Sequence, residues 1–424
     1  MKCIYRKNID DIINACTQTL NDNHRHIGND VGWHQHLGSH KVGIVATAMA
    51  LLYYQMVNEE CPDKEECLEF LKNKKNTDGG WPYISNTNGE SNVESTCWAL
   101  YALYQYDAQL YSKEIEEGTA WLLNQYDLHD DQDSGWPFMK DALPRIYLTA
   151  FVLRTLKRLG KDSGQEYESA KRWLIDARND DGGWGELPER GSSLFFTCYC
   201  IMTLTECGIA EDNIIIVNAL EWLNRKMSEI NMYDSSLICY LEFIEKGTAE
   251  NRVRIPFFHY VLPYVVMTYL KLGKKGHVVF DAIKVLIERS SKGSIEHPML
   301  ENSRIIPIWA LYDTVSAYEC FKDSFKNWED KDKFIDFLGR IWGIGKYNLF
   351  MPLIRISNWF WKFLVVFVVV YIITEYWKDI TSWWGNVQDK TLGQLLISMS
   401  ATIIIAVGQL IWSFVKKKLE TFRK

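Results

Sequence analysis

Hydrophobic residues along the first three quarters of the chain follow helical spacing and recur in a fixed order. An upstream segment carries an aromatic residue followed by Leu, at Phe70-Leu71, Trp121-Leu122 and Trp173-Leu174. A downstream segment carries Thr47, Thr96, Thr149 or Thr197 and then aliphatic residues. A short loop joins the two, so the pattern predicts a repeated hairpin of two helices.

The loop between the two helices has its own signature. A Gly-Trp pair recurs at Gly32-Trp33, Gly80-Trp81, Gly135-Trp136 and Gly183-Trp184, with 48 to 55 residues between tryptophans. An acid and a small residue precede three of these pairs, at Asp78-Gly79, Asp133-Ser134 and Asp181-Gly182. Glycine permits the positive φ that ends a helix, and tryptophan fills the gap between neighbouring hairpins. We therefore interpret these tryptophans as structural.

Weaker copies extend the repeat to about residue 325. Trp222-Leu223 and Val285-Leu286 mark two more first helices, and residues 254–272 and 303–321 fit two more second helices. With residues 9–20 as the opening helix, the count is six hairpins, plus an extra helix near residues 233–245. Repeated hairpins stack as an open solenoid or close into a ring. The chain lacks polar capping repeats, which favours the ring.

The combination of aromatic-Leu, Asp-Gly-Gly-Trp and a Thr-led helix resembles the prenyltransferase and squalene-hopene (terpene) cyclase repeat. The resemblance covers residues 1–325 and is strongest over 64–207. It implies an all-α fold, an α6/α6 toroid with inner helices around a chamber. Lys75, Tyr126 and Arg178 stand where the family often has Gln.

The catalytic signatures of that family are missing from the sequence. Terpene cyclases of the protonating class carry Asp-x-Asp-Asp-Thr, and the matching stretch here is Asn92-Val93-Glu94-Ser95-Thr96. Glu94 is the one acid left, so it is the weak candidate for a catalytic residue. We find no Asp-x-Cys pair like the one that holds zinc in protein prenyltransferases. We therefore lean towards a protein that is not an enzyme and expect no cofactor.

Histidines crowd into the loop before the second helix, at His24, His26, His34, His36 and His40. His34 and His36 offer two imidazoles, but no ordered set of metal ligands accompanies them. We interpret this segment as a polar loop at the rim and predict no metal site.

Charge suggests a ligand. The net charge of −7 excludes a general nucleic-acid binder. Basic residues nevertheless stand at the predicted starts of the inner helices: Lys41, Arg145, Arg190, Arg252, Arg254 and Arg304. Six helix N-termini at one mouth would add their partial positive charge, so we predict an anion site, most naturally for phosphate.

Aromatic residues are predicted to line the chamber below this mouth, at Trp98, Tyr101, Phe195, Tyr199, Phe258, Tyr264, Trp309 and Tyr312. A basic mouth above an aromatic well suits a phosphorylated ligand with an apolar or base-containing body. The alternative is that these side chains fill the core of the ring and that the arginines pair with nearby acids.

The C-terminal quarter predicts membrane attachment. We divide the chain into a toroid domain at 1–325, an amphipathic linker at 326–357 and two transmembrane helices with a basic tail at 358–424. Residues 359–377 and 392–415 are apolar over about the length of a bilayer span. Lys416, Lys417 and Lys418 follow the second span, and the positive-inside rule then places ring and tail in the cytoplasm, at the inner membrane.

Small residues in the second span favour self-association. Ser398, Thr402 and Ala406 recur at steps of four on one face. Packing against the first span of the same chain is the alternative.

Three functions remain after this reading. The first is a membrane-anchored toroid that binds an anionic ligand or a protein partner and acts through its spans; a nucleotide ligand would suit a bacterial antiviral defence effector. The second is an isoprenoid-processing enzyme, and the third is a scaffold that recruits partners to the membrane.

Overall fold

The computed structural model describes residues 2–82, 89–129, 133–138, 144–234, 237–244, 254–290 and 306–325. These ranges form twelve α-helices and three two-stranded antiparallel sheets. Residues Cys3–Lys326 make one compact unit. The predicted all-α fold is therefore right for the ring but wrong in leaving out the strands.

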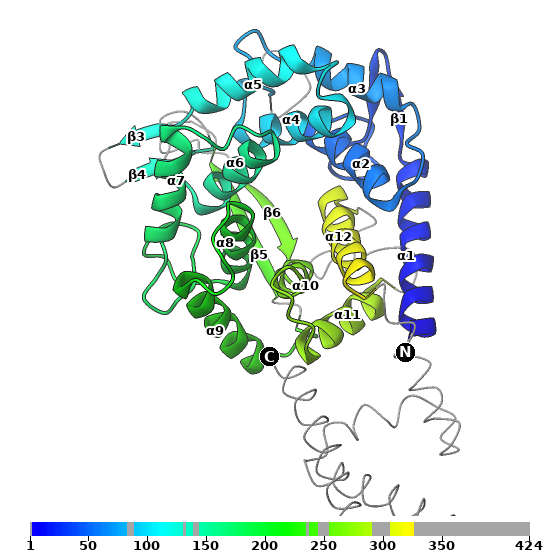
Figure 1. The fold of residues 1–424 in the computed structure, drawn as a ribbon. Helices are drawn as coiled ribbons and strands as arrows, with labels where there is room; N and C mark the ends of the chain where they lie inside the picture. Colours follow the sequence, from blue (N-terminus) through cyan, green and yellow to red (C-terminus); the bar gives the residue numbers. More distant parts are fainter. Residues whose placement is uncertain are drawn as a thin grey trace, which may run out of the picture. The chain divides into compact units, whose positions relative to one another are not determined.

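Of the twelve helices in the described residues, six form an inner ring and six lie around it (Figure 1). The inner helices are α2 (Ile44–Val57), α4 (Val93–Asp107), α6 (Ile146–Arg158), α8 (Leu194–Glu206), α10 (Leu262–Lys271) and α12 (Ile308–Ser324). The outer helices are α1 (Lys2–Asp22), α3 (Lys64–Asn73), α5 (Ser112–Asn124), α7 (Gln165–Asp176), α9 (Ile214–Glu229) and α11 (His277–Arg289). Each inner helix contacts the next, and α12 contacts α2. The ring is closed, as the absence of capping repeats predicts.

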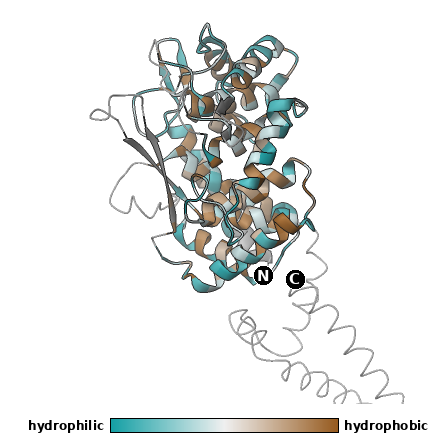
Figure 2. Cartoon of the chain, turned by 90° about the vertical axis from the view of Figure 1, so that its left-hand side faces the viewer, coloured by the Kyte–Doolittle hydropathy of each residue, from teal (hydrophilic) through white to brown (hydrophobic). Residues whose placement is uncertain are grey.

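The two kinds of helix differ in how much of their surface is buried. In α2 every residue from Ile44 to Tyr54 is buried, because inner helices α4 and α12 and the outer helix α3 pack around it. In the outer helix α7 only Tyr167, Ala170, Trp173 and Leu174 are buried, at the three- and four-residue spacing of one helix face. Figure 2 shows hydrophilic and hydrophobic residues side by side along the helices.

The Gly-Trp loop ties each hairpin together, as its fourth copy shows. Trp184 is fully buried, and its indole Nε1 donates to the carbonyl of Leu174 at 2.7 Å. Its backbone N–H donates to Thr197 Oγ1 at 3.0 Å. The same bond in the other three copies explains the Thr near the start of the first four inner helices. Gly182 has φ +99°, a conformation that favours glycine. The structural interpretation of these tryptophans is correct.

The acid of the loop has a role that the sequence did not reveal. Asp181 Oδ1 accepts from the backbone N–H of Gly183 at 3.0 Å and from Ser192 Oγ at 2.7 Å. Its other oxygen accepts from the indole of Trp222, in the next outer helix, at 2.8 Å. Asp78 makes the same contact with Trp121 at 2.9 Å. Each of these two acids therefore joins its own hairpin to the following one.

The strands form three hairpins in the connections between helices. They are β1 (Arg25–Ile27) with β2 (Asp30–Gly32), β3 (Asp127–His129) with β4 (Asp133–Gly135), and β5 (Ile238–Ile244) with β6 (Arg254–Tyr260).

The third hairpin corrects two predictions. Where an extra helix was predicted near residues 233–245, the described residues 238–244 form strand β5 instead, and the helix predicted from residue 254 begins only at Leu262. The strands are rich in β-branched and aromatic residues, which favour extended backbone. Pro256, opposite Glu242 in the register, cannot donate the backbone hydrogen bond of a helix interior.

The predicted linker and spans, residues 326–357, 359–377 and 392–415, lie outside the described residues. In the described part of the chain, no helix has the length and apolar character needed to cross a membrane.

Candidate functional site

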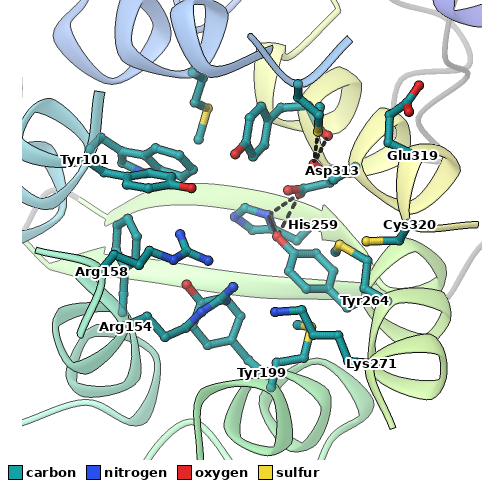
Figure 3. A pocket seen from close by; sticks show the side chains of 18 of the residues that line it. Tyr101, Arg154, Arg158, Tyr199, His259, Tyr264, Lys271, Asp313, Glu319 and Cys320 are labelled. Carbon is teal, nitrogen blue, oxygen red and sulfur yellow. Dashed lines mark hydrogen bonds and ion pairs between the residues drawn. The ribbon is translucent and has the colours of Figure 1, made fainter. Parts of the chain in front are cut away.

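A chamber of about 430 Å³ lies at the centre of the ring, lined by side chains of all six inner helices and of β6 (Figure 3). Apolar and aromatic side chains form most of its wall, while charged side chains gather at one end. Clefts of this size and character commonly hold small organic ligands.

Aromatic rings from four inner helices build the wall. Trp98 of α4 packs edge-to-face on Tyr312 of α12, with centroids 5.5 Å apart. Tyr147 of α6 packs against Tyr199 of α8 at 5.0 Å. Rings that pack on one another lose little freedom when a ligand binds, so this wall offers a rigid apolar surface.

Three cations share one carboxylate at the charged end. Arg154 Nε and Nη2 donate to the two oxygens of Glu206 at 2.9 and 3.1 Å. Arg158 Nη2 reaches the same carboxylate at 3.3 Å, and Lys271 pairs with it too. One negative charge is therefore set against three positive ones.

These charges control one another's protonation. Burial alone would raise the pKa of Glu206, but the three cations outweigh it and hold the pKa well below the usual range. Burial and the neighbouring Arg154 lower the pKa of Lys271, although Glu206 opposes them. The carboxylate is thus ionised at neutral pH, and the cluster keeps an excess of positive charge.

Aromatic faces hold the two guanidinium groups in place. The Arg158 Cζ lies 4.5 Å from the centroid of Tyr101, and the Arg154 Cζ lies 5.1 Å from that of Tyr199. Such stacking suits arginine, whose flat group is weakly hydrated.

Acidic groups from α12 line the same chamber. Glu319 and Asp323 belong to its lining, and Figure 3 shows Glu319 across the chamber from Arg154 and Arg158. Glu319 pairs with Lys322 of its own helix at 2.8 Å. The charged end therefore has a cationic side and an acidic side.

A polar network occupies the other end of the chamber. The Tyr264 hydroxyl donates to Asp313 Oδ2 at 2.8 Å, and His259 Nδ1 lies 3.4 Å from the same oxygen. His259 comes from β6, and Figure 3 shows the strands of this hairpin passing behind the labelled side chains. Burial, followed by the charge of Asp313, raises the pKa of Tyr264 well above its usual value, so its hydroxyl remains a donor.

Glu94 is buried behind this end. Its Oε1 accepts from the hydroxyl of Tyr147 at 3.1 Å. Burial raises the pKa of Glu94 to about 6, against smaller lowering effects of His259 and Tyr147. Tyr147 lines the chamber, whereas Glu94 is not among the lining residues. The carboxyl is thus a weak acid without direct contact with the cavity.

Most of the aromatic residues that we predicted to line the chamber do line it. Five of them line it: Trp98, Tyr101, Tyr199, Tyr264 and Tyr312. Phe195 packs behind Tyr264 at 4.7 Å, and Trp309 packs against His259 at 6.1 Å. For Phe258 the structure describes the backbone only, paired with Tyr240. That any of them binds a ligand stays a prediction.

The predicted basic residues do not line this chamber where their side chains are described. Lys41 and Arg190 are exposed, and Arg145, at the N-cap of α6, pairs with Glu186. Arg252, Arg304 and the side chain of Arg254 lie outside the described residues. His259 of β6 packs against Tyr147 and Phe195, which lie at the starts of α6 and α8. The β5–β6 hairpin therefore occupies the end of the ring where we predicted an open, basic mouth.

The cations around the chamber come from the opposite helix ends. Arg158 and Lys271 are the last residues of α6 and α10, where the negative end of the helix dipole stabilises positive side chains. The sequence held a signal for two of them, because Tyr147, Phe151, Arg154 and Arg158 follow one helix face.

Comparison with known proteins agrees with this architecture. The sequence matches the prenyltransferase alpha-alpha toroid domain over residues 2–128 and 132–237. No curated protein matches it.

Solved structures share the fold at low sequence identity. A family 76 glycoside hydrolase from a bovine Bacteroides thetaiotaomicron strain has a TM-score of 0.51 and 12% identity, covering 75% of this chain and 78% of that one. An alpha-amylase from Clostridium perfringens also has a TM-score of 0.51, with 13% identity over 73% and 98%. A variant of the type II terpene cyclase MstE from Scytonema has a TM-score of 0.48 and 13% identity over 76% and 99%.

At this identity the likeness to the glycoside hydrolase and to the amylase shows the fold alone. The match of the family model is of another kind, because it spans more than half of the sequence and includes the repeats that build the ring. The chain belongs to the prenyltransferase alpha-alpha toroid domain family.

Proposed function

We propose that this chain is a membrane-tethered binding protein whose toroid takes an anionic ligand with an apolar or aromatic body into its central chamber. The anionic group contacts Arg154, Arg158 and Lys271, and the body packs on the aromatic wall. The single observation that carries this proposal is the cluster of three cations around one carboxylate, Glu206, on the cationic side of an aromatic chamber.

The charge balance supports an anion at this place. Glu206 compensates one of the three cations that it contacts. Arg158 keeps a side-chain exposure of 27% and Lys271 one of 34%, so both have donors left for a ligand. Arginine and lysine in a partly buried site bind phosphate through charge-assisted hydrogen bonds. The acidic side of the chamber would accept N–H donors of the same ligand.

Binding without chemistry is favoured by the state of Glu94. Protonating an alkene needs a strong, pre-positioned acid, whereas burial weakens this carboxyl and raises its pKa to about 6. The hydroxyl of Tyr147, which cannot act as a strong acid, stands between Glu94 and the chamber.

Matched ligand pairs test the proposal. Binding is measured by calorimetry for geranyl diphosphate against geraniol and for AMP against adenosine. We expect at least one phosphorylated member to bind about 10-fold or more tightly than its uncharged partner. Arg158→Gln removes that difference, whereas Lys157→Gln leaves it, because Lys157 does not line the chamber and pairs with Asp162. Equal affinities within both pairs, or equal losses in both variants, contradict the proposal.

An isoprenoid-processing enzyme is the second candidate. It is favoured by the position of Glu94 in the stretch that matches the catalytic motif of terpene cyclases, near the chamber and hydrogen-bonded to Tyr147. Organic extraction of the purified protein followed by mass spectrometry would reveal a prenyl compound. Its conversion by the wild type and its persistence in Glu94→Gln would favour the enzyme over the binding protein.

The tether itself rests on the sequence of residues 358–424. We propose two spans, with toroid and tail in the cytoplasm and with subunits associating through Ser398, Thr402 and Ala406. If the ligand is a nucleotide signal, its binding would trigger the spans to permeabilise the membrane, as in a bacterial defence effector. Dye release from vesicles that carry the full chain, with and without ligand, tests this step. A scaffold that only recruits proteins would release no dye under either condition.

A further inference from the structure

Two histidines and an aspartate meet outside the ring, between the first hairpin of strands and the start of α3. His26 Nε2 lies 2.7 Å from Asp63 Oδ2, and His24 Nδ1 lies 3.6 Å from the same oxygen. One ligand atom of each residue lies within 4.8 Å of the other two. The residues come from β1, from the residue just before it and from the residue that precedes α3.

The spacing of these atoms suits a metal ion. A tetrahedral ion with bonds of about 2.0–2.1 Å to nitrogen and oxygen holds its ligand atoms about 3.4 Å apart. The two separations, 2.7 and 3.6 Å, stand on either side of that value. A shift of about 0.7 Å in the exposed His26 side chain would therefore bring its nitrogen to the tetrahedral separation from Asp63. The ligand atoms of the two histidines already lie within 4.8 Å of each other.

The His24 ring is held in position for this role. It packs on Trp33 with centroids 4.6 Å apart, and its side chain is 10% exposed. Its second nitrogen, Nε2, faces Cys67 Sγ at 3.8 Å. A histidine whose ring is packed and whose other nitrogen has a partner loses little freedom when it binds a metal.

The Asp63 carboxylate faces the imidazoles and does not form the capping hydrogen bond expected at its position. The residue occupies the N-cap of α3, where an aspartate normally accepts from the first free N–H groups of the helix. Its side chain makes no such bond, and its backbone has φ +45°. The carboxylate is instead turned towards His24 and His26.

We propose that His24, His26 and Asp63 bind one divalent late first-row cation, with Zn²⁺ as the best fit and water completing the coordination. Two imidazole nitrogens and one carboxylate oxygen are a ligand set that zinc accepts in proteins, whereas Mg²⁺ and Ca²⁺ prefer oxygen ligands. The ion clamps the β1–β2 hairpin to the start of α3. The competing interpretation is an ordinary ion pair between His26 and Asp63.

Metal titration of the purified full-length chain separates the metal site from the ion pair. The protein is kept in detergent if it fractionates with membranes. The protein is stripped with a chelator, and Zn²⁺ is titrated against a chromophoric competitor. We expect one tightly bound equivalent and a rise in the thermal unfolding midpoint on adding Zn²⁺, because the ion binds the folded state preferentially.

Variants place the bound ion. His26→Asn and Asp63→Asn each lower the zinc affinity by about 10-fold or more, since each removes a ligand. His34→Asn, a change in the following loop, is the matched control and leaves the affinity unchanged. The circular dichroism of the stripped variants should equal that of the stripped wild type, which excludes misfolding. The proposal is overturned in favour of the ion pair if the wild type binds no measurable zinc. It is also overturned if the wild type, His26→Asn and Asp63→Asn bind zinc with equal affinity.

Discussion

Arg154 and Glu206 form a two-pronged ion pair that joins α6 to α8 at the charged end of the chamber. Because Arg158 and Lys271 contact the same carboxylate, Glu206 holds three cations together. Glu206→Gln leaves three partly buried positive charges facing one another without compensation. We expect it to lower the free energy of unfolding by roughly 2–3 kcal/mol at pH 7, between the costs for exposed and for fully buried ion pairs, measured by urea denaturation.

An exposed ion pair between α6 and the loop that follows it provides the control. Lys157 and Asp162 pair with side chains 42% and 31% exposed, so Asp162→Asn should cost only about 0–1 kcal/mol. Pyrophosphate should also stabilise Glu206→Gln more than it stabilises the wild type, because the variant lacks the competing carboxylate. Equal losses in the two variants would show that the cluster does not hold the helix ends together.

Asp181 should matter more for stability than its neighbour in the same loop. Asp181→Ala leaves the buried indole N–H of Trp222 and the backbone N–H of Gly183 without their acceptor. We expect a loss of about 2 kcal/mol. Asp180→Ala, at a position with no such contacts among the described residues, should stay within about 0.5 kcal/mol of the wild type. Thermal unfolding of the two variants side by side checks the difference, and equal midpoints would contradict the linking role.

The repeat made the ring predictable, whereas the chamber was predictable only in part. The contact between Trp184 and Thr197 has a counterpart in each of the four clear repeats, so a Trp and a Thr recur at fixed spacing in the sequence. That pattern revealed the helices and their order. The strands of β5 and β6 break that order. Their extended backbone depends on pairing between segments that no local pattern relates.

The charged cluster was missed for a related reason. Basic residues at helix starts drew attention because free N–H groups there attract anions. Arg158 and Lys271 are the last residues of α6 and α10, and Arg154 lies one turn before the end of α6. Only the packing of α6 and α10 against α8 brings the three cations to Glu206. The proposed metal ligands show the same limit, because His26 and Asp63 are 37 residues apart in sequence and only the fold brings them together.

Membrane attachment should depend entirely on the C-terminal residues. We expect the full chain to remain in the membrane pellet after alkaline carbonate washing, and residues 1–325 to appear in the supernatant, because both apolar segments lie beyond residue 358. A tag on the C-terminus should resist external protease in intact spheroplasts and be cleaved after lysis, since the positive-inside rule places the tail in the cytoplasm. Carbonate extraction of the full chain would contradict the two spans.

Glu94 should make stability depend on pH in a direction set by its burial. The folded protein keeps the proton up to a pKa of about 6, whereas the unfolded chain releases it near 4.5. Between these values the folded state binds more protons, so the contribution of Glu94 to stability falls as the pH rises and then stays constant. At about 1.4 kcal/mol for each pKa unit, the total loss is about 2 kcal/mol.

Glu94→Gln has no proton to lose, so its stability relative to the wild type should rise by about 2 kcal/mol between pH 4.5 and 7.5. Urea unfolding at several pH values measures this difference, with Glu168→Gln, in the exposed part of α7, as a control that should show no trend. A fall in the relative stability of Glu94→Gln over the same range would mean that the lowering effects of its neighbours, His259 first, outweigh burial and bring the pKa of Glu94 below 4.5. The carboxylate would then be a fixed charge at the hairpin end of the chamber, and the ligand there would have to be neutral or cationic.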